Sequence, residues 1–448
     1  MSVSVSSNVR SVVVPAVIVV VTLAVFAPVL GNGFVEWGDR GELVENPHYR
    51  GLDLQSLQWM LTTIHQGHYQ PLTWLSFAVD DAFWGMRPAG YHLTSLLLHA
   101  ACAVVVYLII GRLLGPTAIL AALTGALLFA LHPLRVEAVA WATERRGPLS
   151  SLMALLSILA YLRGARWWSL AFFALGLLAK EFVMTLPVVL VILDVYPLRR
   201  RAWREKIPFF VLTLIAAVVA IKSSGQSGLA LSLAEYGVLE RIGQCFYGLV
   251  FYLLKTLVPV GLSPIYSIPP EVDPFAARYV VSALIVVALT AGLVAARKRF
   301  PAGLAAWAIF IVILSPVLGL VQTGHQLAAD RYTYLPGAVI AVLVAAGLAR
   351  LDRRPLVVAM VAWIAVAAVL NWHQVAVWRD DETLWTHAVE VNPRCHISNH
   401  NLGTAMARQE RWEEAAAAYR RALEADPDML DARRALDLLP SRAGQPKP

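Results

Sequence analysis

Long apolar segments separated by short polar stretches run through most of the chain. A helix needs about 20 predominantly apolar residues to cross a bilayer. The pattern therefore predicts an all-α, polytopic bundle of about eleven membrane-spanning helices. The segments are 11–30, 92–111, 116–131, 149–162, 167–180, 183–196, 207–221, 279–296, 302–321, 335–350 and 355–371.

Composition supports a membrane protein. Of the 448 residues, 58% are hydrophobic and only 15% are charged, whereas soluble domains carry about 25% charged residues. The net charge of +7 comes from basic clusters at 199–206, 297–299 and 350–354, which lie between apolar segments. Such clusters mark cytoplasmic loops, so we expect the N-terminus in the cytoplasm and no nucleic-acid partner.

This orientation places three polar and aromatic segments, 32–91, 132–148 and 322–334, on the outer side. Loops tolerate polar groups that the bilayer core excludes, so we expect the functional site there. The same orientation predicts that 241–260 lies in the outer interface as an amphipathic helix. If that segment crosses instead, another one must be re-entrant.

The composition becomes soluble and helical near residue 377. The stretch "NLGTAMARQERWEEAAAAYRRALEADP" fits a tetratricopeptide repeat, and Pro393 precedes Pro427 by the repeat's period of 34 residues. We therefore expect a membrane domain at 1–376, a repeat region at 377–439 and a disordered tail at 440–448. The residues expected to pack the repeat are Leu402, Gly403, Ala415, Tyr419, Ala422 and Pro427.

Acidic residues follow the first apolar segment directly, in "EWGDRGELVENP". A carboxylate beside a low-dielectric boundary has a raised pKa and can act as a base near neutral pH; a solvated loop is the alternative. Further along the same outer segment, Tyr69, Trp74 and Asp80 lie in a stretch rich in aromatic residues. This composition is typical of a headgroup-level belt and would also suit a sugar site.

Cationic and acidic residues also occupy the later outer segments. His132 and Glu137 lie in "LHPLRVEAVAWATERRGPL", Lys180 lies between two apolar segments, and Arg331 and Tyr332 precede another. Ionisable residues at such depth are candidates for function, and guanidinium groups suit phosphate. Structural ion pairs are the alternative. The three cysteines show no metal-ligand spacing, and no zincin helix or nucleotide-binding motif appears.

Several of these stretches together resemble one family. They are "EWGDRGELVENP", "YQPLTWLSFAVDDAFWGMRPAGYHLTSLLLHA", "LHPLRVEAVAWATERRGPL", "AKEFVMTLPVVLVILDVYPLRR" and "ADRYTYLP", followed by the repeat. Their order is similar to that in the transmembrane and tetratricopeptide-repeat-containing O-mannosyltransferases and their bacterial relatives, which are GT-C-type glycosyltransferases. The chain departs from the family at Gly38 and Gly147, where relatives carry acids, and at Arg135, where they often carry histidine.

The resemblance implies a transfer on the outer face of the membrane. The donor would be a mannose-like sugar on polyprenyl phosphate, and the acceptor a Ser or Thr hydroxyl of an exported polypeptide held by the repeat. Asp39 would be the catalytic base; Arg331, Lys180 and His132 would bind the donor phosphate. The sugar or acceptor would meet the remaining candidates: Glu42, Tyr69, Trp74, Asp80, Glu137 and Tyr332.

Other hypotheses stay open. The chain could be a non-catalytic scaffold that uses its repeat for envelope protein interactions, or a transferase acting on lipid or glycan. No cofactor is assigned, and a role for a divalent metal ion is left open. The expected location is the bacterial inner membrane, among membrane lipids, with the outer loops and the repeat in the periplasm.

Overall fold

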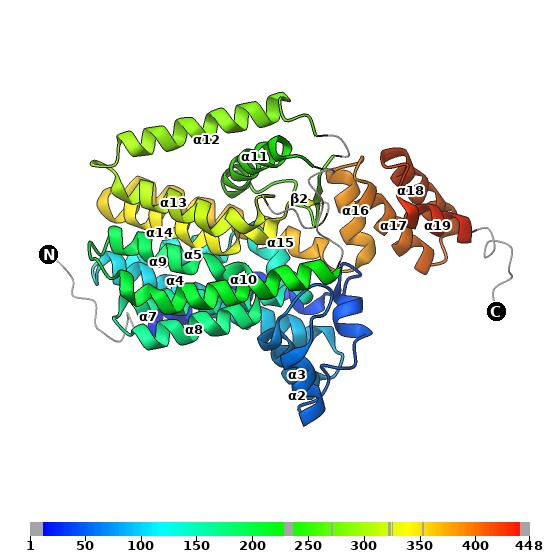
Figure 1. The fold of residues 1–448 in the computed structure, drawn as a ribbon, viewed down its shortest axis with the longest axis horizontal. Helices are drawn as coiled ribbons and strands as arrows, with labels where there is room; N and C mark the ends of the chain where they lie inside the picture. The colour runs from blue at the N-terminus through cyan, green and yellow to red at the C-terminus, as the bar shows by residue number, and fades with distance from the viewer. Residues whose placement is uncertain are drawn as a thin grey trace.

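The computed structural model describes residues 12–227, 236–269, 272–320, 324, 326–351 and 354–439; the tail predicted at 440–448 lies outside them. Each of the eleven predicted apolar segments forms a helix (Figure 1). These helices are α1 (Val14–Phe26), α4 (Pro88–Leu114), α5 (Ile119–Ala130), α7 (Arg146–Leu162), α8 (Arg166–Ala179), α9 (Leu186–Val195), α10 (Ile207–Ser227), α12 (Ala277–Ala295), α13 (Pro301–Leu314), α14 (Tyr334–Leu351) and α15 (Arg354–Val377).

Not all eleven helices are long. Within the described residues, six helical segments are long and apolar enough to cross a membrane: Val14–Gly31, Pro88–Leu114, Trp203–Ser223, Ala277–Ala295, Asp330–Arg350 and Val357–Val377. A seventh arises if the pair Ile119–Ala130 and Pro133–Ala140, bent by 57°, is one span. The chain is therefore an integral membrane protein, and the count of eleven spans stays a prediction.

Further helices and turns lie between these eleven helices or at their ends. They comprise α2 (Leu54–Thr62), α3 (Pro71–Trp84), α6 (Val136–Ala140) and α11 (Val238–Leu257), with η2 (Ala27–Gly31), η3 (Arg40–Val44), η4 (Pro133–Arg135), η5 (Thr143–Arg145), η6 (Glu181–Thr185), η7 (Trp203–Lys206), η8 (Ser315–Val317) and η9 (Asp330–Thr333). The apolar segment 241–260 forms α11, which is not among the six long apolar segments. Whether α11 lies in the interface stays a prediction.

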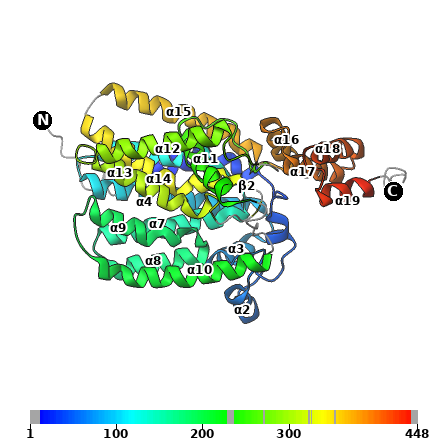
Figure 2. The same ribbon diagram turned by 45° about the horizontal axis from the view of Figure 1, so that its top comes forward.

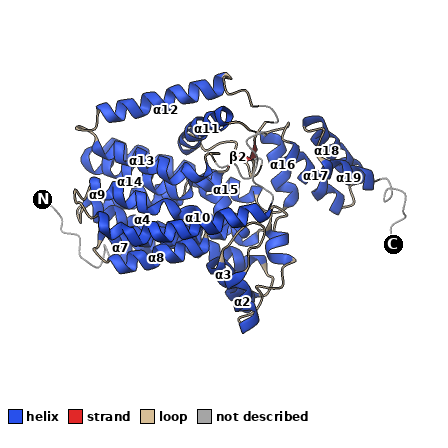
Figure 3. Ribbon diagram, in the orientation of Figure 1, coloured by secondary structure: helices blue, strands red, loops and turns tan. Residues whose placement is uncertain are grey.

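One small sheet interrupts the all-α architecture. The strands β1 (Tyr266–Ser267) and β2 (Gln326–Ala328) pair antiparallel, with Tyr266 opposite Ala328. Figure 3 shows that helices dominate everywhere else. The sequence pattern did not predict this pair, because two or three residues are too few to show strand alternation.

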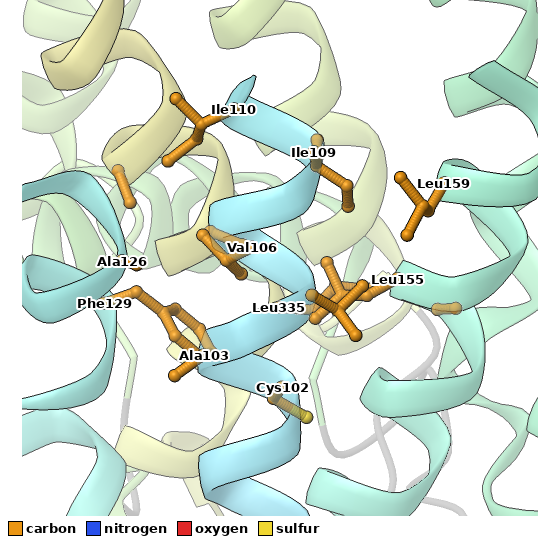
Figure 4. Close-up of a cluster of buried hydrophobic side chains, with 14 of the residues drawn as sticks. Cys102, Ala103, Val106, Ile109, Ile110, Ala126, Phe129, Leu155, Leu159 and Leu335 are labelled. Atoms are coloured by element: carbon orange, nitrogen blue, oxygen red, sulfur yellow. The ribbon is translucent and has the colours of Figure 1, made fainter. Parts of the chain in front are cut away.

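The main core lies where α4 packs between α5, α7 and α14 (Figure 4). Val106 and Ile109 of α4 face Ala126 of α5 and Leu155 of α7. A Cβ on Gly125 would lie 2.9 Å from the backbone oxygen of Ala341. This glycine therefore allows α5 and α14 to approach closely, as small residues do between membrane helices.

The C-terminal helices α16 (Asp381–Val391), α17 (His396–Arg408), α18 (Trp412–Ala425) and α19 (Leu430–Leu438) lie at one end of the bundle, as Figures 1 and 2 show. Leu402, Ala415, Tyr419 and Ala422 are buried where α17 meets α18. Pro427 follows α18 and accepts a hydrogen bond from Arg433 through its carbonyl oxygen. These contacts join neighbouring helices into one stack.

The repeat region lies against the start of the first outer segment. The amide of Gly33 donates to the carbonyl oxygen of Arg379 at 2.8 Å, and that of Glu36 to Asp381 Oδ1 at 2.6 Å. Arg408 pairs with Glu36, and the Trp37 and Trp385 rings meet edge to face at 5.2 Å. The two regions therefore share one buried core rather than a flexible linker.

Gly403 provides a test of packing inside the repeat. Its Cβ, if added, would lie 2.7 Å from the Tyr419 ring, whereas a Cβ on Gly292 in α12 meets no atom within 4 Å. Alanine favours a helix over glycine by about 1 kcal/mol, so Gly292→Ala should not lower the thermal stability of the full chain. Gly403→Ala should lower the free energy of unfolding by about 1–3 kcal/mol, because the added methyl group overpacks the contact with Tyr419. Equal melting temperatures would contradict this packing.

Candidate active site

Four segments far apart in the sequence meet at one end of the bundle, beside α3 and the repeat. They are the turn η3, the stretch from α6 to the start of α7, the α8–η6 junction and η9. The short helix η6 contacts α7, α8 and α9 there, and η9 contacts α6 and α14. Most of the charged candidates from the sequence are brought into this one buried cluster.

Glu137 and Arg331 form an ion pair in the cluster. Arg331 Nη1 lies 2.5 Å from Glu137 Oε1, and the Arg331 backbone amide donates to Glu137 Oε2 at 2.6 Å. Their side chains are only 3% and 7% exposed. The Arg331 guanidinium also lies over the rings of Trp141 and Tyr332, at 5.3 and 4.9 Å from their centroids. A charge pair this deeply buried is strongly held, because neither ion can be left without the other.

A second group of charges surrounds Glu144. Its carboxylate pairs with Lys180 and accepts a hydrogen bond from Arg146 Nε at 3.2 Å. Lys180 also lies near Arg331, and the two positive charges repel each other. A Cβ on Gly147 would lie 2.7 Å from Glu144 Oε1. The Glu144 carboxylate thus occupies the space that a side chain at position 147 would need.

Asp39 is fully buried and bridges two segments. Its Oδ1 accepts from the backbone amide and the hydroxyl of Thr143, at 2.8 and 2.6 Å, and its Oδ2 accepts from the amide of Val35 at 3.0 Å. Burial raises the pKa of Asp39 to about 6, while these hydrogen bonds oppose the shift. The carboxylate can therefore change its charge near neutral pH.

Glu42 follows Asp39 by three residues, on the turn η3. It is 2% exposed, and its Oε2 accepts from Gln70 Nε2 at 3.3 Å. Burial raises the pKa of Glu42 to about 7; the nearby charge of Arg146 opposes the shift and that of Asp39 adds to it. Asp39 and Glu42 are called the acidic pair below.

Gly38 has a backbone reason to be glycine. Its φ is +115°, and a Cβ there would lie 3.3 Å from the Trp141 ring. Residues other than glycine rarely adopt this conformation. The carboxylates of this loop therefore come from positions 39 and 42 and not from position 38.

The remaining candidates lie around the cluster or away from it. Tyr332 is close: its ring lies 6.0 Å from Lys180 Nζ, and its hydroxyl accepts from Gln326 Nε2 at 2.5 Å. His132 is held elsewhere, with its Nε2 2.9 Å from the Thr256 carbonyl oxygen and its ring against Trp363. The structure does not place it with Lys180 and Arg331 through any contact of the described residues.

Three candidates from the first outer segment are occupied by structural contacts. Trp74 is fully buried and stacks on Tyr49 at 5.8 Å. Asp80 pairs with Arg145 and accepts from the Thr94 hydroxyl at 2.6 Å. The Tyr69 hydroxyl donates to the Leu61 carbonyl oxygen at 2.9 Å. Their contribution to a sugar or acceptor site stays a prediction.

The sequence did not single out several members of the cluster as site residues. Glu144 and Arg146 stand in a visible run of charges, "TERRG", but nothing local shows which partners they meet. Thr143 and Gln70 carry no sequence signal, and their importance follows from contacts with residues far along the chain. No group of three or more His, Cys, Asp or Glu side chains in the described part of the chain is placed to hold a metal ion.

Comparison with known proteins gives the cluster a context. Residues 72–223 match the family model of dolichyl-phosphate-mannose-protein mannosyltransferases, and residues 397–429 match that of the tetratricopeptide repeat. The protein O-mannosyl-transferase TMTC2 of Mus musculus is 33% identical over 166 residues, which cover 34% of this chain and 20% of TMTC2. The human TMTC3 is 22% identical over 427 residues, or 81% of this chain and 45% of TMTC3.

One solved structure is also similar. The crystal structure of ArnT from Cupriavidus metallidurans bound to undecaprenyl phosphate has a TM-score of 0.41 and 16% identity, covering 95% of this chain and 76% of ArnT. The chain spans between 14% and 49% of the length of the curated relatives it matches. With a mannosyltransferase match in its membrane region and a repeat match after it, the chain is similar in both regions to the TMTC protein O-mannosyl-transferases.

Proposed function

We propose that the chain is a GT-C-type membrane glycosyltransferase that moves a mannose-like sugar from polyprenyl phosphate to a Ser or Thr hydroxyl of an exported polypeptide. The observation that carries this proposal is the buried cluster, in which Glu42 of the acidic pair neighbours Arg146, and Arg146 in turn neighbours Lys180 and Arg331. Such a transfer needs a base for the hydroxyl proton and cations for the leaving phosphate.

The roles follow from charge. The base is a carboxylate of the acidic pair, to which Asp39, the base suggested by the sequence, belongs. Lys180 and Arg331 stabilise the negative charge that develops on the phosphate as the bond to the anomeric carbon breaks. Both cations are already held in place by Glu144 and Glu137, so they need little reorganisation during the reaction. One displacement inverts the anomeric carbon.

An apolar cavity supports a lipid-linked donor. A cavity of about 80 Å³ lies among α4, α7, α9, α13 and α14, lined entirely by aliphatic side chains such as Leu155, Val189 and Leu335. One lining residue, Leu335, follows Arg331 by four residues along the chain. In this proposal a part of the prenyl chain enters this space and the phosphate meets Lys180 and Arg331.

The orientation of the site is part of the proposal. Helix α9 begins beside the cluster, so the basic stretch 199–206 that follows its end lies at the opposite end of the bundle. With basic residues on the cytoplasmic side, the cluster and the repeat face the other side, which is the periplasm in a bacterial inner membrane. The docked repeat would then present the polypeptide next to the site.

Reconstitution tests the proposal directly. Proteoliposomes with polyprenyl-phosphate mannose should glycosylate a Ser/Thr-rich peptide. Lys180→Gln should lower the turnover about 10²–10³-fold, because one preorganised donor to the phosphate is lost. Lys222→Gln, which changes an exposed lysine of α10, is the control and should match the unchanged protein.

Other results would redirect the assignment. Transfer to added lipid or glycan, and not to peptide, would identify a lipid- or glycan-directed transferase. Absence of transfer to all three acceptors, combined with envelope proteins bound through the repeat, would favour the scaffold hypothesis and end the enzymatic one.

A further inference from the structure

The two carboxylates of the acidic pair have different surroundings. Asp39 accepts three hydrogen bonds, from Val35 and twice from Thr143, and is 0% exposed. These bonds tie the first outer segment to the stretch before α7. The hydrogen bonds that the Asp39 carboxylate accepts therefore serve to hold these two segments together.

The Glu42 carboxylate accepts fewer hydrogen bonds than that of Asp39. Its carboxylate accepts one hydrogen bond from the described part of the chain, that from Gln70 at 3.3 Å. The backbone amide of Glu42 donates to the Gly38 carbonyl oxygen at 2.9 Å, which fixes the turn that presents the side chain. Its second carboxylate oxygen therefore has capacity for a substrate proton.

Two neighbours of Glu42 also have unused hydrogen-bonding groups. Gln70 Oε1 and Arg146 Nη1 are buried and have no partner among the described residues. Gln70 bonds Glu42 directly, and the charge of Arg146 acts on Glu42. Buried polar atoms without partners are uncommon in proteins and need an explanation. The hydrogen-bonded Glu42 and Gln70 side chains and the neighbouring Arg146 guanidinium therefore each have spare hydrogen-bonding capacity.

A hydroxyl compound fits these three groups. A hydroxyl donates one hydrogen bond and accepts others, so it can donate to Glu42 and accept from Arg146 at once. We propose that Glu42 is the general base that takes the proton of the acceptor hydroxyl, and that Asp39 is a positioning residue that holds the Glu42 turn. This assignment rests on the proposed glycosyl transfer.

The proposed transfer exchanges one bond at the anomeric carbon for another. The acceptor oxygen forms a bond to the anomeric carbon, and the bond from that carbon to the donor phosphate oxygen breaks. The hydroxyl proton goes to Glu42, which becomes neutral. The bonding electron pair leaves with the polyprenyl phosphate, which gains one negative charge beside Lys180 and Arg331.

The ionisation of Glu42 sets the expected pH dependence. Its pKa is raised to about 7, and a base works in its ionised form, so transfer should rise with pH through about 7. The charged groups facing it are Asp39 on its own segment and Arg146 of α7. Beyond them, His65 lies 3.4 Å from the Gly41 carbonyl oxygen, and His68 pairs with Glu181 at 3.7 Å.

Three variants of one turn test the assignment through their pH–rate profiles. Glu42→Gln should lower transfer at least 10²-fold, the usual contribution of a general base. Asp39→Asn should keep measurable transfer with its rising limb moved to lower pH, because the Asp39 charge raises the pKa of Glu42. Glu45→Gln, at a carboxylate that is 57% exposed, is the control and should keep the profile of the unchanged protein.

Folding is checked by binding of polyprenyl phosphate, which Glu42→Gln should retain. If that variant does not bind the lipid, Glu42→Asp replaces it, and a loss of transfer with lipid binding intact is again expected. Transfer by Glu42→Gln within tenfold of the unchanged protein, or a loss confined to Asp39→Asn, would overturn the assignment and leave the proposed function standing. No transfer by the unchanged protein would overturn both.

Discussion

Arg331→Met is expected to destabilise the protein by about 3–5 kcal/mol and to abolish measurable sugar transfer. The substitution leaves Glu137 buried without its ion partner, and breaking one side of a buried pair has this cost. It also removes a cation that we assign to the donor phosphate. Thermal unfolding of the purified protein and peptide glycosylation in proteoliposomes measure the two effects separately.

A double variant separates stability from chemistry. In Glu137→Gln with Arg331→Met the buried charge is gone, and the glutamine oxygen can still accept from the backbone amide of residue 331. Stability should return to within about 1 kcal/mol, because neutral replacement of a buried pair is often tolerated, whereas transfer should stay lost. Recovery of transfer in the double variant would show that Arg331 serves the fold alone.

An exposed pair supplies the matched control. Arg40 and Glu45 lie 2.5 Å apart with side chains 48% and 57% exposed. Arg40→Met should change the free energy of unfolding by less than about 1 kcal/mol, as for most surface ion pairs. A large loss of stability in Arg40→Met would mean that any ion pair in the first outer segment is sensitive to substitution, whether or not it is buried.

Trp385→Ala is expected to loosen the first outer segment although residue 385 belongs to the repeat region. Trp385 is fully buried and contacts Trp37, one residue before Gly38. The cavity left by the missing indole ring should lower the free energy of unfolding by about 3–5 kcal/mol. Hydrogen exchange at residues 33–45 should become faster, and transfer should fall by about 10²-fold, as expected from small displacements of catalytic groups.

Trp372→Ala is the control for this prediction. Trp372 lies on α15 and is 59% exposed, so its removal should leave exchange at 33–45 unchanged and stability within about 0.5 kcal/mol. If Trp385→Ala accelerates exchange only within the repeat, the two regions are not mechanically joined and the docking contacts are incidental.

The sequence was informative about the helices because apolar runs have a length that the bilayer requires. The segments predicted at 207–221 and 335–350 correspond to α10 and α14. Boundaries differ more where a proline or capping group intervenes: α4 begins at Pro88 and not at residue 92. Proline is favoured in the first turn of a helix, which moves the start into the preceding polar stretch.

The partners within the site could not be predicted in the same way. Glu137 meets Arg331 across 194 residues, and Thr143 meets Asp39 across 104. Such pairings depend on how whole helices pack, which periodicity does not encode. The sequence did suggest Asp39, Lys180 and Arg331 as candidates, because each lies beside or between apolar segments. It could not distinguish the hydrogen bonding of Asp39 from that of Glu42, which only the folded turn reveals.

The contact between the repeat region and the membrane region limits where an additional repeat unit can attach. The side of the array formed by α16 already contacts the membrane region, because Trp385 meets Trp37 and His387 Nε2 lies 2.9 Å from the Leu262 carbonyl oxygen. Stacked repeats contact only their neighbours, so that side cannot accept another unit. An additional unit would have to attach beyond α19, and a longer array would extend outward as an arm whose inner anchor stays in place.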